Sequence, residues 1–453
     1  MTNVVFKHIF ARSQKKTINL LNQLIMISEK LLHYIWKNQW FAKEKLQTVH
    51  QQPVSIINQG FPHQDAGPDF KQAIIKIDGV TWAGNVEIHI RSSDWYRHEH
   101  QHDMKYNSVI LHVVFEHDRE VLLSQGNSLP TLELQGLLPS QLLLRYNQLM
   151  HAPLPLPCEA YIEKLDALSM HAFFARLTFD RLSRKQAQIL DILHTFSENW
   201  EQTLFYVLCQ SFGFKTNAPA FEMLGKALPF KILNKHSHSH LQVAALIFGQ
   251  AGMLDEELDD SYYQSLQNEY LYLKAKYKLI PIHVKCWNLL RLRPHNFPCI
   301  RLAQLGEVIY KHHDLFAKVT TPNKLAYFQN ILVNKPNDYW RTHYYFGKTS
   351  RESEKIMGER SFHLLLINAL IPFLYAYGTF MGNAKLQEYS MRLLEFLPFE
   401  ENHITKKYQC MGFCAKNASD SQALLELHHE YCEQKRCIDC GVGQRIVSMD
   451  ISR

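Results

Sequence analysis

The stretch GPDFKQAIIKIDGVTWAGNVEIH, residues 67–89, decides the fold of the first part of the chain. Apolar residues alternate with polar ones along 70–77, and this period of two predicts a β-strand. Asp78 and Gly79 follow, a pair that is typical of a tight two-residue turn. A second run, 80–90, places Trp82 and the apolar residues after it on one face. The stretch therefore predicts a β-hairpin.

This hairpin brings residues with metal-binding chemistry together. Glu87 and His89 are two positions apart, so their side chains share the face opposite the apolar one. Asp69 stands where the first strand begins, and a tight turn brings that point beside the end of the partner strand. Two carboxylates there suit Mg²⁺ or Mn²⁺, and His89 can position or activate the attacking water. The pattern predicts metal-dependent hydrolysis of a phosphodiester.

The order of the expected elements points to a family. A helix over 28–37, extending to about 47, precedes strands over 54–57, 70–77 and 80–90, a polar helix or helical turn over 98–107 and a buried strand over 109–115; two further strands are expected near Val121 and Leu132. With Pro68-Asp69, Glu87 and His89, this order resembles the PD-(D/E)XK nuclease superfamily over about residues 28–116. The resemblance implies a restriction-endonuclease-like α/β core, Asp69 and Glu87 as the Mg²⁺ ligands, and an additional acid from the first helix, for which Glu29 is the candidate. His89 departs from the family pattern, which usually has Lys at this position.

Two other functions remain open. Residues 94–103 read DWYRHEHQHD, and His98 and His102 would lie one turn apart on a helix. A Zn²⁺-dependent hydrolase that uses His98, His100 and His102 is therefore an alternative. Within the nuclease interpretation, His102, Asp103 and Tyr106 would instead line the cleft and contact the phosphate or the leaving group. The main rival is a catalytically inactive scaffold that binds nucleic acid or protein, since the superfamily includes inactive members.

The pattern changes after about residue 155, where the spacing of apolar residues becomes helical. Residues 151–158 hold three prolines and predict a linker. We expect an α+β protein with a start extension at 1–25, a nuclease-like α/β domain at 26–150 and a large all-helical domain at 159–453. The expected helices of the last domain are 177–193, 200–212, 240–254, 262–277, 362–377 and 421–431.

The helical part contains two further candidate sites. Arg291, Arg293 and Arg301 surround the loop RPHNFP, and guanidinium groups suit the phosphates of a nucleic acid; pairing with acids such as Glu307 is the alternative role. Near the C-terminus, Cys432, Cys437 and Cys440 have a spacing that suits a structural Zn²⁺ or an iron–sulfur cluster, with the fourth ligand undetermined.

Composition limits the remaining possibilities. Apolar residues make up 46% of the 453 residues and charged residues 20%, which excludes a disordered chain. The net charge is +6, but four cations at 1–25 carry most of it, so bulk charge is weak support for a nucleic-acid partner. No apolar run is long enough to predict a membrane span. Six of the nine cysteines are scattered or lie in apolar runs, with no evenly spaced disulfide framework, which favours a reducing cytoplasm.

The chain from about Met26 onward is also similar to an uncharacterised bacterial family with a domain of unknown function. The similarity rests on several specific strings, which are LHYIWK at 32–37, AGPDF at 66–70, GNVEIH at 84–89, SDW at 93–95, VILHVV at 109–114, RLRPHNFP at 291–298 and the cysteine segment 431–440. The resemblance implies no established activity.

Overall fold

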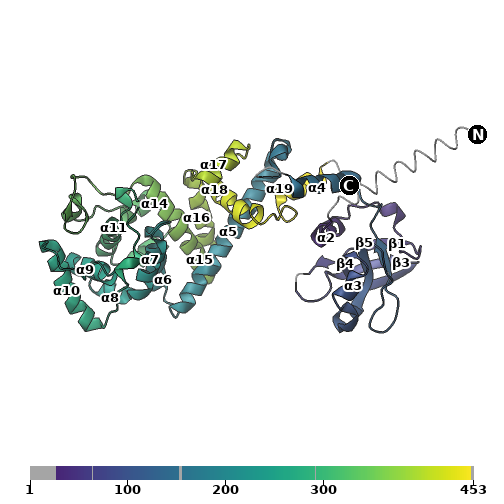
Figure 1. The fold of residues 1–453 in the computed structure, drawn as a ribbon, viewed down its shortest axis with the longest axis horizontal. Helices are drawn as coiled ribbons and strands as arrows, with labels where there is room; N and C mark the ends of the chain where they lie inside the picture. The colour runs from purple at the N-terminus through teal and green to yellow at the C-terminus, as the bar shows by residue number, and fades with distance from the viewer. Residues whose placement is uncertain (1–26, 64, 153–155, 291, 450–453) are drawn as a thin grey trace, which may run out of the picture. The chain divides into compact units, whose positions relative to one another are not determined.

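The computed structural model describes residues 27–63, 65–152, 156–290 and 292–449 (Figure 1). The expected start extension at 1–25 and Arg291 lie outside the described residues. The described parts of Met1–Met170 and Leu427–Arg453 form one compact unit, and His171–Glu426 form the other. The C-terminal segment thus groups with the N-terminal part of the chain, whereas the sequence pattern placed it with the helical domain.

The first unit is built on a mixed β-sheet. Its strands are β1 (Val54–Asn58), β2 (Phe61–Pro62), β3 (Phe70–Ile77), β4 (Val80–Arg91), β5 (Val109–Glu116) and β6 (Thr131–Glu133). The order across the sheet is β1-β3-β4-β5-β6, and β2 also pairs with β3. The pairs β1–β3 and β3–β4 are antiparallel, whereas β4–β5 and β5–β6 are parallel. The parallel strands place β5 directly beside the part of β4 that carries Glu87 and His89.

The predicted hairpin is confirmed. Ile77 pairs with Val80 across the turn, and both turn residues have positive φ, 48° at Asp78 and 81° at Gly79. Such a turn matches the twist of the two strands, and Asp-Gly is among the few pairs that adopt it readily. The turn therefore fixes which residues of β3 and β4 face each other.

Helix α2 (Glu29–Asn38) confirms the predicted first helix but ends well before residue 47. It begins at Ser28, whose side chain accepts the backbone N–H of Leu31, and it ends at Gln39 in a left-handed conformation. Four apolar side chains from Leu31 to Trp36 are fully buried, and the helix packs against β4 (Figure 1). This packing holds the polar residues of α2, including His33, beside the strand.

The segment after β4 differs from the expected helix. It consists of the short helix α3 (Asp94–Arg97) and two 3₁₀ turns, η2 (His100–His102) and η3 (Met104–Ser108). Glu99 adopts a φ of 61° between them, which breaks the helical path. His98 and His102 therefore do not lie one turn apart on a helix, and the predicted pairing of these two histidines is wrong.

The second unit is largely helical, as predicted, although β7 (His343–Tyr345) and β8 (Lys348–Thr349) form a small hairpin within it. A continuous apolar core runs through this unit. The remaining α-helices of the described residues are α4 (Ser140–His151), α5 (Ala167–Thr195), α6 (Trp200–Phe212), α7 (Ala218–Ala227), α8 (Phe230–Lys235), α9 (His240–Gln250), α10 (Ser261–Tyr277), α11 (Pro298–Lys311), α12 (Leu315–Thr320), α13 (Leu325–Leu332), α14 (Glu359–Leu365), α15 (Ile371–Phe380), α16 (Ala384–Phe396), α17 (His403–Cys410), α18 (Ala418–Glu426) and α19 (Gly441–Ser448).

Among the described residues, one helical stretch, Glu359–Phe380, is long and apolar enough to cross a membrane. Of its most apolar window, 72% is buried inside the protein. A helix buried in the core of a folded domain passes the same test of length and composition, so the stretch is weak evidence for a membrane span.

Candidate metal centre

Asp69 and Glu87 are brought together as the sequence predicts. The backbone N–H of Asp69 donates to the Glu87 carboxylate over 3.1 Å, and the backbone N–H of Ile88 donates to the Asp69 carboxylate over 3.0 Å. These two bonds clasp the start of β3 to β4. His33 of α2 adds a third contact, with its Nε2 3.1 Å from Asp69 Oδ2.

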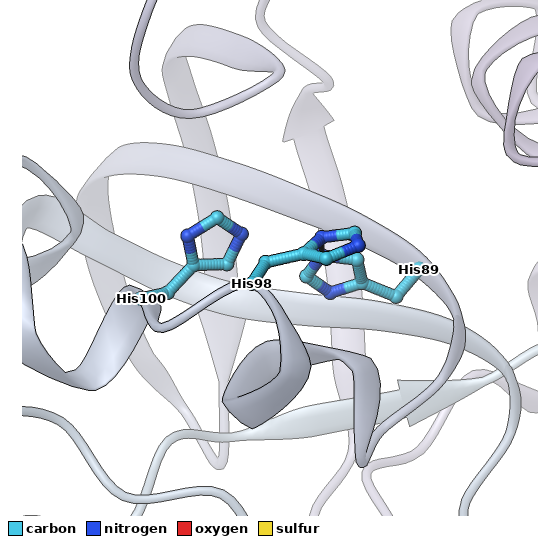
Figure 2. Close-up of side chains that lie close together, drawn as sticks. All are labelled: His89, His98 and His100. Carbon is cyan, nitrogen blue, oxygen red and sulfur yellow. Dashed lines mark hydrogen bonds between the residues drawn. The ribbon is translucent and has the colours of Figure 1, made fainter.

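His89 lies on the same side of β4 as Glu87, as predicted, at the centre of a histidine cluster. Its Nδ1 is 2.8 Å from Nε2 of His112, and its Nε2 is 3.1 Å from Nδ1 of His98. Ligand nitrogens of His89, His98 and His100 all lie within 4.8 Å of one another. Figure 2 shows the three rings gathered together, with His89 from β4 and His98 and His100 from the segment that follows α3.

Glu87 connects the carboxylate pair to the histidines. Its Oε1 lies 3.6 Å from His89 Nε2 and 3.3 Å from His100 Nε2. We call Asp69, Glu87, His89, His98 and His100 the metal-centre residues. They come from three short segments that β3, β4 and the irregular segment 98–108 hold in place.

The centre is buried on one side and open on the other. Glu87 is 4% exposed and His89 is 1% exposed. His98 is exposed, and the side chains of Asp69 and His33 are 23% and 35% exposed. Solvent and small groups can therefore approach from the edge formed by His33, Asp69 and His98.

Aromatic packing fixes the buried side. Trp95 is fully buried, and its ring centroid lies 5.3 Å from that of His100 and 5.5 Å from that of His112. Tyr106 stacks on His100 with 3.8 Å between centroids. These contacts restrict the rotation of the imidazoles, which is the pre-organisation that a metal site needs.

Burial also sets the protonation of the centre. Burial, followed by the charge of Asp69, raises the pKa of Glu87 well above its ordinary value. Burial and the neighbouring histidines lower the pKa of His89, and burial lowers the pKa of His112 to about 3. His89 and His112 are consequently neutral at neutral pH, the state in which imidazole binds a metal ion.

The pKa of His33 is shifted in the opposite direction from those of His89 and His112. Burial acts to lower its pKa, but the hydrogen bond and charge of Asp69, together with the charges of Glu29 and Glu87, outweigh burial and raise it. His33 therefore gains positive charge more readily than an ordinary histidine. The sequence analysis did not single out His33, because its position in α2 shows no relation to β3 until the two elements pack together.

The donor set fits a metal ion. His100 Nε2 is buried and makes no hydrogen bond that satisfies it, and its charged neighbour is Glu87 Oε1 at 3.3 Å. Three imidazole nitrogens beside a carboxylate suit Zn²⁺ or another transition-metal ion, whereas Mg²⁺ prefers oxygen ligands. Mn²⁺ accepts both the carboxylates and the imidazoles.

The other residues predicted for this site differ in how close they lie to the metal-centre residues. Glu29 is close enough to influence the pKa of Glu87 and of His33. Asp103 raises the pKa of Tyr106, after the larger effects of burial, Glu87 and Asp69, and its side chain accepts the N–H of Lys105. His102 is exposed and is not part of the histidine cluster.

The predicted arginines occupy different environments. Arg293 is exposed. Arg301 is 4% exposed; its guanidinium donates to Gln304 and Asn296 and lies over the ring of Phe214. Burial lowers the pKa of Arg301 to about 10. The Arg301 side chain thus supports the helical core, whereas Arg293, the other described arginine of the three, is exposed.

A fourth cysteine lies beside the three C-terminal cysteines in the structure. Cys432, Cys437 and Cys440 line a cavity in the first unit together with Cys158. Cys158 was not predicted to join them, because it is an isolated cysteine at the end of the predicted linker.

Comparison with known proteins identifies a family but no characterised relative. A family model described as "Protein of unknown function (DUF2851)" matches residues 29–403. No curated protein and no solved structure matches the chain.

Proposed function

We propose that this chain, which belongs to the DUF2851 family, is a metal-dependent hydrolase that cleaves phosphodiesters in nucleic acid. The observation that carries the proposal is a set of three histidines whose ligand nitrogens lie within 4.8 Å of one another, with the Glu87 carboxylate against His89 and His100 and Asp69 beside Glu87. Convergence of ligand-type side chains from separate elements, with shifted pKa values, is typical of functional sites.

The strand arrangement supports a nuclease-like core. Three antiparallel strands are followed by a fourth that runs parallel to the third, and the acids lie at the start of β3 and within β4. These strands follow the order on which the resemblance to the PD-(D/E)XK superfamily rests, while α3 and two 3₁₀ turns stand in place of the helix expected over 98–107. The likeness extends to Glu29, whose charge acts on Glu87 from the first helix.

The roles of the residues follow from their geometry. His89, His98, His100 and Glu87 would hold the metal ion, with Asp69 beside Glu87 at the open edge. A divalent ion there would offset negative charge on a scissile phosphate. His33, with its raised pKa, can hold a phosphate oxygen or donate a proton to the leaving oxygen. His112, behind His89, fixes the orientation of that ring.

This ligand set modifies both sequence-based hypotheses. The donor atoms favour Mn²⁺ or Zn²⁺ over Mg²⁺, and His89 replaces His102 in the proposed histidine triad. The inactive scaffold remains the second candidate, because the deep burial of Glu87 and His89 restricts access from the sheet side.

A cleavage assay tests the proposal. The full chain is incubated with labelled single- and double-stranded DNA and RNA in the presence of Mg²⁺, Mn²⁺ or Zn²⁺. We expect cleavage with Mn²⁺ or Zn²⁺. His98→Ala should reduce the rate by more than about 100-fold, the upper end of the loss seen when only an outer partner of a ligand is removed.

His102→Ala is the matched control, because His102 is a nearby exposed histidine outside the cluster. It should leave cleavage unchanged. A chain that binds the metal but cleaves none of these nucleic acids supports the scaffold instead. Equal loss in both variants would exclude the proposed ligand set.

A further inference from the structure

Four cysteines that are far apart in the sequence meet at one cavity of the first unit. Cys158, Cys432, Cys437 and Cys440 all line a cavity of about 310 Å³. Cys158 is the last residue of the predicted linker, and the other three lie within the C-terminal segment. This set is separate from the metal-centre residues and does not depend on the proposed function.

Local backbone structure holds the three C-terminal cysteines in a compact loop. The N–H of Lys435 bonds to the carbonyl of Cys432 over 3.1 Å, and the N–H of Cys440 bonds to the carbonyl of Cys437 over 3.3 Å. Lys435 adopts a φ of 52°, which turns the chain between the first two cysteines. Consecutive tight turns of this kind aim several cysteine side chains at one point, as metal-binding loops do.

The start of α19 presses closely on this loop. A Cβ atom at Gly443 would clash with the carbonyl oxygen of Cys437, so only glycine permits the approach. Cys440 is the residue immediately before α19 and is buried. The loop and the helix thus form one rigid wall of the cavity.

Cys158 is close enough to the loop to interact with it. Burial is the largest effect on the Cys158 thiol, and Cys432, Cys440 and Cys437 each raise its pKa further. Four thiols around a shared cavity form a complete set of ligands for a soft metal centre.

The spacing of the sulfurs indicates the kind of centre. A single Zn²⁺ with Zn–S bonds of about 2.3 Å holds its sulfurs about 3.8 Å apart. Among the described residues, the ligand groups whose atoms all lie within 4.8 Å of one another include no cysteine. A four-iron cluster holds its cysteine sulfurs farther apart and occupies the space between them.

We propose that Cys158, Cys432, Cys437 and Cys440 are the four ligands of one [4Fe–4S] cluster. The cluster ties the C-terminal segment to the end of the N-terminal α/β part. Existing contacts prepare this connection, since α19 packs on α4 and Lys30 pairs with Asp439 at 3.4 Å. The role of the centre is structural.

Metal analysis of the full chain, purified without oxygen, tests this proposal. We expect about four iron and four sulfide ions per chain, as the cluster formula requires, and a visible absorption band. Cys158→Ser and Cys437→Ser should each lose both. Cys410→Ser is the matched control, because Cys410 is exposed and lies in the other unit, and it should keep the cluster.

Three other outcomes would overturn part or all of the proposal. One zinc ion per chain, lost in both ligand variants, would keep the four ligands and overturn the iron–sulfur assignment. Absence of any metal, or full retention of metal in Cys158→Ser, would overturn the site. Circular dichroism of each variant separates loss of a ligand from loss of the fold, and Cys437→Ser serves if Cys158→Ser does not fold.

Discussion

The backbone N–H of Asp69 donates to the side chain of Glu87 over 3.1 Å, so the two acids of the candidate centre are held together by the strands themselves. This bond satisfies one oxygen of a carboxylate that is 4% exposed. The other oxygen faces His89 and His100. Glu87 is therefore the residue through which the sheet and the histidine cluster are coupled.

The burial of Glu87 predicts a pH effect on the metal-free protein. Because its folded pKa is raised above the ordinary value of 4.5, the folded state binds more protons than the unfolded state above pH 4.5, and stability falls as pH rises towards the folded pKa. Glu87→Gln keeps the shape without the titration. We expect the variant to be more stable than the wild type at pH 8, with a smaller difference at pH 5.

Urea unfolding of chelator-treated protein at the two pH values measures this difference. Glu44→Gln is the control, since Glu44 is an exposed acid of the same unit. If the wild type were the more stable protein at pH 8, Glu87 would be ionised in the fold and the account of its burial would be wrong.

The same titration predicts that metal binding releases a proton. At neutral pH Glu87 is protonated in the metal-free state because of its raised pKa, and it must ionise to become a ligand. Affinity for Mn²⁺ should therefore rise with pH by up to about tenfold per unit, the limit for one proton. Calorimetry in buffers of different ionisation enthalpy counts the proton. A binding constant independent of pH from 6 to 8 would exclude Glu87 as a ligand.

His112 should influence metal binding without being a ligand. Its Nε2 lies 2.8 Å from His89 Nδ1, on the side away from His98, so it orients the ring. His112→Leu should weaken Mn²⁺ binding about 10- to 100-fold, the usual effect of removing such a partner. His112→Gln, which can still hydrogen-bond, should recover part of the loss. Equal losses in the two variants would assign His112 a packing role only.

The two described arginines of the RPHNFP loop region should respond differently to truncation. Arg301→Ala removes buried hydrogen bonds to Gln304 and Asn296 and should lower the free energy of unfolding by about 1–3 kcal/mol. Arg293→Ala, at an exposed position, should change it by less than about 0.5 kcal/mol. Denaturant unfolding of both variants checks this, and a stable Arg301→Ala protein with weakened binding to DNA would restore the predicted contact role.

The sequence predicted the hairpin well because the signals are local. The alternation along β3 and β4 and the Asp78-Gly79 turn determine the pairing of these strands without reference to the rest of the chain. The pairing in turn places Asp69 beside Glu87, and so this part of the site was accessible to sequence reasoning.

The histidine cluster was less accessible because it depends on tertiary contacts. His112 reaches His89 only because β5 pairs with β4 in parallel, with His112 opposite Glu87. The left-handed backbone at Glu99 separates His102 from the cluster and brings His100 in. Cys158 joins the other cysteines through the packing of segments that have no common sequence pattern.

Mn²⁺ binding to the full chain, measured by equilibrium dialysis, tests the central claim most directly, because Mn²⁺ does not favour thiolate ligands and so reports on the histidine–carboxylate centre alone. The account predicts one Mn²⁺ per chain in the wild type and in His102→Ala, and loss of that ion in His98→Ala and Glu87→Gln. Undiminished Mn²⁺ binding in His98→Ala and Glu87→Gln, or no Mn²⁺ binding by the wild type, would contradict it.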